Sequence, residues 1–110
     1  MSSPEFHDPA LDHAIDQGRT VIDDHGVKVG TVTDVVFDDA TNAATWAVVK
    51  TGMAGGEHYV PLAGAYRADD GGLVIAFSKR LVKASPKAGR EHVLSVSEEE
   101  DVRTHYGLVA

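Results

Sequence analysis

Residues 27–50 read VKVGTVTDVVFDDATNAATWAVVK, and this stretch decides the fold. β-Branched and aromatic residues crowd its two ends, 27–37 and 45–50, while a polar run at 38–43 separates them. Such apolar runs are typical of β-strands, and Asp, Thr and Asn between them favour a turn. The stretch therefore predicts two antiparallel strands joined by a short connection.

The second of these strands is apolar on both faces. Trp46 and Val48 alternate with Ala47 and Val49, and successive strand residues point to opposite sides of a sheet. One pair can fill the core, whereas the other would be a costly exposed patch unless something covers it. We expect the cover to be either a C-terminal helix or a second copy in a homodimer. The predicted interaction surface consists of Val32, Val36, Trp46, Val48, Val102 and Tyr106.

Shorter β-signals flank the hairpin, with Gly- and Asp-rich turn signals between them. They lie at residues 20–22, 58–62, 65–68 and 73–77. The connections are too short for crossover helices, so we expect antiparallel pairing throughout. Six short twisted strands tend to close on themselves, because closure removes exposed edges. The sequence predicts a mainly β fold, a small six-stranded antiparallel barrel.

The C-terminal part predicts a helix. Ser95 with Glu98 and Ser97 with Glu100 are two overlapping capping signatures, and Gly107 can end the helix. We divide the chain into a partly flexible N-terminal arm at 1–18, the barrel at 19–85, and a loop with a docking helix at 86–110.

Composition and charge exclude several classes of protein. The 110 residues suffice for one domain, and with no cysteine there is neither a disulfide framework nor a thiol nucleophile. No secretory signal is evident at residues 1–13, and no apolar run reaches the roughly 20 residues that span a bilayer. We expect a cytoplasmic protein without membrane insertion. The net charge of −7 repels phosphate backbones, so we expect no nucleic-acid partner.

The motifs in this order resemble a PRC-barrel domain. They are VID…GVKVGTVTDV at 21–35, WAVVKTG at 46–52, YVPLAGA at 59–65, FSK at 77–79 with LVK at 81–83, and LS…EEE…HYGL within 94–108. This family is named after the cytoplasmic domain of the photosynthetic reaction centre H subunit and includes the C-terminal domain of the ribosome-maturation factor RimM. The resemblance covers about residues 14–108 and is closest to short, free-standing actinobacterial members. It implies a six-stranded barrel that binds other proteins or its own copies, with no catalytic residues to transfer.

The glycine-rich segment Gly52–His58 is the strongest candidate for a ligand site. A phosphate-binding loop usually carries Gly-Lys-Ser/Thr before a helix, and neither feature is present here. Glu57 and His58 are adjacent, so in a strand they face opposite sides. The segment is therefore interpreted as a corner between strands, one that a partner can still recognise.

The remaining polar residues predict no metal, cofactor or catalytic site. His92 and His105 have no second potential metal ligand at close spacing in the sequence. The histidines of the arm have only aspartates near them. Asp38–Asp39 and Asp69–Asp70 fall at turns, where aspartate bonds to the local backbone. Ser78 and Ser85 have no adjacent histidine and no nucleophile elbow.

We therefore expect a non-enzymatic protein–protein interaction module, either a cytoplasmic adaptor for an unknown protein or a self-associating scaffold. The alternative is a small-ligand or metal-responsive regulatory domain that uses the Gly52–His58 corner. A ribosome-assembly factor of RimM type is a third reading, which the acidic charge disfavours.

Overall fold

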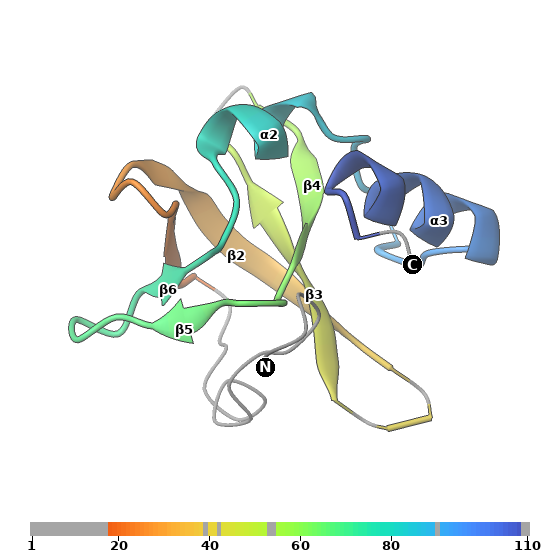
Figure 1. Ribbon diagram of the computed structural model, residues 1–110, viewed down its shortest axis with the longest axis horizontal. Helices are drawn as coiled ribbons and strands as arrows, with labels where there is room; N and C mark the ends of the chain where they lie inside the picture. The colour runs from red at the N-terminus through yellow and green to blue at the C-terminus, as the bar shows by residue number, and fades with distance from the viewer. Residues whose placement is uncertain (1–17, 39, 42, 53–54, 90, 109–110) are drawn as a thin grey trace.

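The computed structural model describes residues 18–108, apart from 39, 42, 53–54 and 90. The described residues form six strands and two helices (Figure 1). These are β1 (Thr20–Ile22), β2 (Lys28–Phe37), β3 (Ala44–Lys50), β4 (Glu57–Pro61), β5 (Tyr66–Arg67), β6 (Leu73–Val74), α2 (Lys79–Ala84) and α3 (Val96–His105). The predicted N-terminal arm lies outside the described residues except for Gly18.

The strands form one mixed sheet in the order β4-β3-β2-β1-β6-β5. The predicted β2–β3 hairpin is confirmed, and β3 also pairs antiparallel with β4. The expectation that every pair is antiparallel is wrong, because β1 and β6 run parallel. That expectation considered only strands joined by short connections. In the sequence, β2 to β5 lie between β1 and β6, so no short connection sets the relative direction of these two strands.

The sequence predicted a closed barrel, but in the described part of the chain the backbone pairing does not form a closed ring. The sheet order ends at β4 and β5, and no pairing joins these two strands. The outer edge of β4 is met instead by the segment after α2. The Ala88 N–H donates to the Glu57 carbonyl oxygen at 2.7 Å, and His58 forms an isolated antiparallel bridge with Lys87. This contact protects an otherwise open sheet edge.

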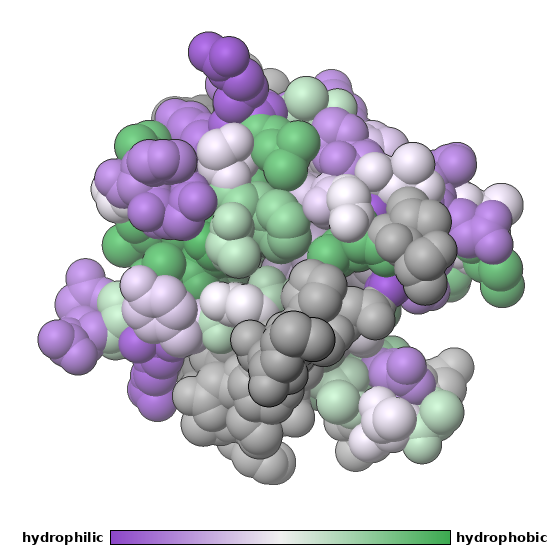
Figure 2. Space-filling model, in the orientation of Figure 1, coloured by the Kyte–Doolittle hydropathy of each residue, from purple (hydrophilic) through white to green (hydrophobic). Residues whose placement is uncertain are grey.

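The centre of the sheet is buried on both faces. Trp46, Ala47, Val48 and Val49 of β3 are at most 2 % exposed. Residues paired across neighbouring strands share a face. One face therefore carries Asp34, Val36, Trp46, Val48, Glu57, Tyr59 and Pro61, and we call it the Trp46 face. In the view of Figure 2, apolar residues gather between α2 and the β5–β6 hairpin, with polar residues around them.

Helix α2 packs against β4 and β2 and was not predicted. Two backbone N–H groups at its N-terminus have side-chain acceptors. The Leu81 N–H donates to Ser78 Oγ at 3.2 Å, and the Lys79 N–H donates to Asp23 Oδ2 at 3.1 Å. Val82 is fully buried. A helix of six residues has fewer than two turns, which is too short for a periodic apolar pattern to show in the sequence.

Helix α3 has the predicted N-terminal cap, which uses the first of the two overlapping signatures. Ser95 Oγ accepts from the Glu98 N–H, and the Glu98 carboxylate accepts from the Ser95 N–H. Near its end, Tyr106 Oη donates to the buried Tyr59 carbonyl oxygen at 2.8 Å. His105 Nε2 lies 2.7 Å from the Leu81 carbonyl oxygen, which ties α3 to α2. None of the helices in the described ranges is long and apolar enough to cross a membrane.

Replacing Gly30 with alanine should destabilise the sheet strongly. A Cβ at Gly30 would overlap the Lys50 carbonyl oxygen of β3, whereas a Cβ at Gly89 would meet nothing within 4 Å. We expect Gly30→Ala to lower the free energy of unfolding by about 3 kcal/mol or to prevent folding. The matched variant Gly89→Ala should stay within about 0.5 kcal/mol of wild type in urea unfolding followed by Trp46 fluorescence. Equal stability of the two variants would contradict this close approach of β2 and β3.

The hydroxyl of Tyr106 should contribute measurably to stability. Burial raises the pKa of Tyr106 to about 12, so the hydroxyl keeps its proton and can donate to Tyr59 at neutral pH. Tyr106→Phe leaves a buried carbonyl oxygen without this donor and should lower the free energy of unfolding by about 1–3 kcal/mol. Tyr66→Phe removes the hydroxyl of an exposed tyrosine and serves as the control. A Tyr106→Phe variant as stable as this control would contradict the proposed contribution.

Candidate functional site

A histidine joins two strands on the Trp46 face. His92 Nδ1 lies 3.0 Å from Asp34 Oδ2 of β2, and its Nε2 lies 3.0 Å from Glu57 Oε1 of β4. Thr33 Oγ1 donates to the second oxygen of Glu57. Because both ring nitrogens face carboxylate oxygens, both can donate only when the ring is a cationic imidazolium. We call Thr33, Asp34, Glu57 and His92 the His92 cluster.

The pKa values of the cluster follow from these contacts. The hydrogen bonds to Glu57 and then to Asp34 raise the pKa of His92 above its usual 6.5. The hydrogen bond from His92 lowers the pKa of Asp34, and the hydrogen bonds from Thr33 and His92 lower that of Glu57. The arrangement therefore favours one cation held between two anions.

The His92 cluster fastens the segment between α2 and α3 onto the sheet. The backbone of His92 has φ = +55°, a left-handed conformation that is uncommon for residues other than glycine and is more accessible to Asn, Asp and His. The cluster holds this conformation in place, and its charged groups are occupied with one another. Such mutual engagement suits a structural fastening better than proton transfer, which requires a free acceptor or donor.

His58 lies on the opposite face of β4 from Glu57, as the sequence predicts. Its Nδ1 is 3.1 Å from the Ser85 carbonyl oxygen and 3.0 Å from Ser85 Oγ, while Ser85 Oγ donates to the Val82 carbonyl oxygen. Nδ1 therefore carries a hydrogen and donates to Ser85. Burial lowers the pKa of His58, which favours its neutral form, whereas the pKa of His92 is raised. Glu57 and His58 thus belong to different contacts and do not form a ligand pair.

The Gly52–His58 corner is closed by its own backbone, although residues 53–54 lie outside the described part. Gly52 has φ = +84°, which glycine adopts without strain. The backbone N–H and the hydroxyl of Thr51 both donate to the Gly56 carbonyl oxygen at 3.2 Å. This geometry agrees with the interpretation of the segment as a corner between strands.

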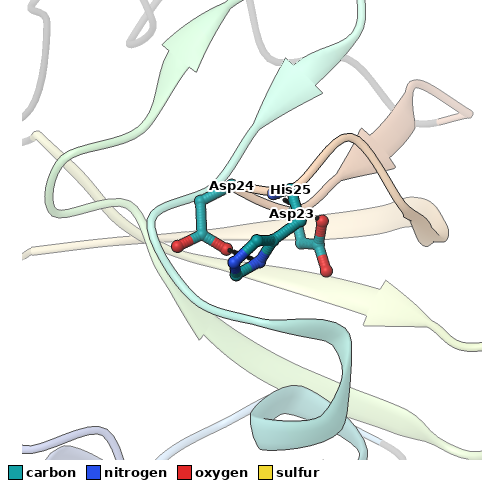
Figure 3. A group of neighbouring side chains, drawn as sticks. All are labelled: Asp23, Asp24 and His25. Carbon is teal, nitrogen blue, oxygen red and sulfur yellow. Dashed lines mark hydrogen bonds and ion pairs between the residues drawn. The ribbon is translucent and has the colours of Figure 1, made fainter.

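Asp23, Asp24 and His25 form one group of potential metal ligands in the described residues (Figure 3). Asp24 Oδ1 lies 3.0 Å from His25 Nδ1, and both side chains are largely exposed. The Asp23 carboxylate is committed to the backbone: it accepts from the N–H groups of His25, Val27 and Lys79. The group is therefore best explained as the β1–β2 turn, with Asp23 also holding the start of α2.

At the other two predicted turns, Asp38 and Asp70 bond to the local backbone, as predicted. Asp38 Oδ1 accepts from the N–H groups of Ala40 and Thr41, and Asp70 Oδ1 accepts from that of Gly72. Asp39 lies outside the described residues. These carboxylates define turns.

The six residues predicted as an interaction surface are mostly inside the protein. The buried ones are Val32, Trp46, Val48, Val102 and Tyr106, each at most 5 % exposed, and only Val36 is partly exposed. Val102 and Tyr106 place α3 and its C-terminal end in the same core cluster as Trp46 and Val48. The C-terminal helix thus covers part of the Trp46 face.

A groove lies beside Trp46. A hollow of about 490 Å³ is lined by Val36, Phe37, Asp38, Ala40, Thr45, Trp46, His92, Val93, Leu94 and Glu99. Phe37 and Val93 are 49 % and 69 % exposed at its margin. A second hollow of about 200 Å³ shares Asp38, Thr45 and Trp46 with the first and continues to Arg103 and Leu108. We call these two hollows together the Trp46 groove.

The hydroxyl of Tyr59 is a polar group that sequence reasoning missed. It is buried on the Trp46 face and has no hydrogen-bond partner among the described residues. Burial raises the pKa of Tyr59, and the negative charges of Glu98, Asp34 and Glu57 act in the same direction. Tyr59 therefore lies beside the acidic side of the His92 cluster as an uncharged group.

Fold and site together define a small, mainly β protein whose described part covers the sheet with two helices and presents a groove of mixed apolar and acidic lining. The family model for the PRC-barrel domain matches residues 17–82, more than half of the chain and all six strands. The chain therefore belongs to the PRC-barrel domain family, as its motifs indicated. Comparison with curated proteins finds no match.

The stability supplied by the His92 cluster should depend on pH. The raised pKa of His92 gives stability that is present below about pH 6.5 and is lost as the pH rises through the folded-state value. The lowered pKa values of Asp34 and Glu57 give stability that is present above about pH 4.5 and is lost as the pH falls through their folded-state values. The cluster should thus contribute most between about pH 4.5 and 6.5.

His92→Asn tests this expectation, because asparagine tolerates the left-handed backbone but cannot join both carboxylates. We expect a loss of about 1 kcal/mol near pH 5.5, since the partners are partly exposed, and a smaller loss above pH 8. His25→Asn, in the exposed β1–β2 turn, provides the control for removing a histidine. Urea unfolding across this pH range measures the difference, and a loss that does not vary with pH would refute the charged cluster.

Proposed function

We propose that this PRC-barrel protein is a non-enzymatic interaction module that acts by protein–protein contact, as an adaptor or as a self-associating scaffold. The observation that carries the proposal is the Trp46 groove, where the large apolar residues Phe37 and Val93 are exposed beside buried Trp46. Exposed apolar residues rimmed by polar ones are typical of protein interaction sites.

The polar residues near the groove support contact rather than catalysis. The His92 cluster uses both ring nitrogens and both carboxylates in contacts within the chain. Its effect is to hold one wall of the groove, residues 92–94, against the strands that form the other side. A preorganised wall favours binding, because less conformational freedom is lost when a partner docks.

Affinity capture from an extract of the native cell tests this function, with Phe37→Ala as the groove variant. Tyr66→Ala is the matched control, since Tyr66 is an aromatic residue of similar exposure on β5. We expect a protein, or a second copy of the chain, to be retained by wild type and Tyr66→Ala and at least about tenfold less by Phe37→Ala. Sedimentation of the purified protein identifies the second-copy case. The proposal would be overturned if Phe37→Ala changed neither the retention of a partner protein nor the self-association of the chain.

A further inference from the structure

The Trp46 groove is lined by the β2–β3 hairpin, by residues 92–94 and by α3. Its two hollows share Asp38, Thr45 and Trp46 in their linings, so they lie next to each other. The β2–β3 hairpin forms one wall. Helix α3 contributes Glu99 to the first hollow and Arg103, one turn further along, to the second.

Apolar side chains form part of the otherwise polar lining of the first hollow. Trp46 is 2 % exposed and the partly buried Val36 and Leu94 lie beside it, while Phe37 and Val93 stand at the margin. A hollow of about 490 Å³ lies within the range of sites that enclose a bulky group. This is the environment that an apolar anchor side chain of a partner requires.

The charge around the hollow is negative. Asp38 and Glu99 line it, and α3 carries the exposed acids Glu98, Glu100 and Asp101 on the adjoining turns. The cation at its side, His92, is already matched by the carboxylates of Asp34 and Glu57, and Arg103 of the second hollow donates to the Leu108 carbonyl oxygen. The whole chain carries a net charge of −7. A partner approaching this opening therefore gains from positive charge on both sides of its anchor.

We propose that the Trp46 groove binds a Lys- or Arg-rich segment of another protein, which inserts one apolar side chain between Phe37, Trp46 and Val93 and places its cations against Asp38 and Glu99. This inference rests on the proposed function and names the chemistry of the partner. A second copy is the less fitting occupant: its basic helix α2 carries Lys79, Arg80 and Lys83, but Val82 is fully buried and Leu81 half-buried in its own core.

The test uses the full chain and synthetic peptides. One peptide has a central Leu-Phe pair flanked on both sides by lysines, a second has glutamates in place of the lysines, and a third has the lysines around a Ser-Ser centre. Trp46 is the single tryptophan of the chain and lines the groove, so its fluorescence reports occupation directly. Anisotropy of a labelled peptide gives an independent reading.

We expect the lysine Leu-Phe peptide to bind saturably, at least about tenfold more tightly than either of the other two, and less tightly as salt is raised. Phe37→Ala should weaken binding at least about tenfold, with Tyr66→Ala unchanged. Glu99→Gln should weaken it about two- to fivefold, whereas Glu100→Gln, the neighbouring exposed acid that does not line the groove, should have a smaller effect.

Three results would overturn the inference, and they separate it from the proposed function. Equal binding of the lysine and glutamate peptides would refute the charge preference but leave the groove as a protein-binding site. Self-association that depends on Phe37, without peptide binding, would assign the groove to a second copy. Absence of peptide binding together with capture and self-association indifferent to Phe37 would refute both the inference and the function.

Discussion

The burial of β3 on both faces is the constraint on which the rest of this structure depends. Trp46, Ala47, Val48 and Val49 are all nearly inaccessible, so each face of the sheet needs its own cover. His58, which pairs with Val49, bonds to Ser85 at the end of α2, so α2 and the residue after it cover one face. The other face, which carries Trp46, meets residues 92–94 and α3. The helices are thus parts of the core.

Polar contacts determine where the covers lie. On one face the neutral ring of His58 bonds to Ser85, and on the other the charged ring of His92 joins Asp34 to Glu57. The two histidines respond to pH in opposite senses. The lowered pKa of His58 means that its stabilising effect is lost as the pH falls below about 6.5, whereas that of His92 is lost as the pH rises. The two covers therefore lose their polar support at opposite ends of the pH range.

Local patterns predicted the local structure well. The β2–β3 hairpin, the cap at Ser95 and the opposite orientation of Glu57 and His58 each follow from neighbouring residues, and each is confirmed. The parallel pairing of β1 with β6 and the His92 cluster escaped prediction, because their members are far apart in sequence. His92 reaches Asp34 and Glu57 only because β2 and β4 both pair with β3. Alternation indicated that one of the two pairs in β3, Trp46 with Val48 or Ala47 with Val49, needed a cover, but not that both would be buried.

The groove exists because residues 92–94 and α3, which cover the Trp46 face, do not extend to the end of the β2–β3 hairpin. The β2–β3 hairpin continues to Phe37 and Ala44, beyond the point at which His92 holds the covering segment. The family match ends at residue 82, so the strands belong to the common domain while His92, Val93 and α3 lie after it. One wall of the groove is therefore built from the family fold and the other from the following segment. A change at the exposed Val93 can therefore alter the groove without removing a core side chain, whereas a change at Val102 or Tyr106 in the same segment would also reach the core.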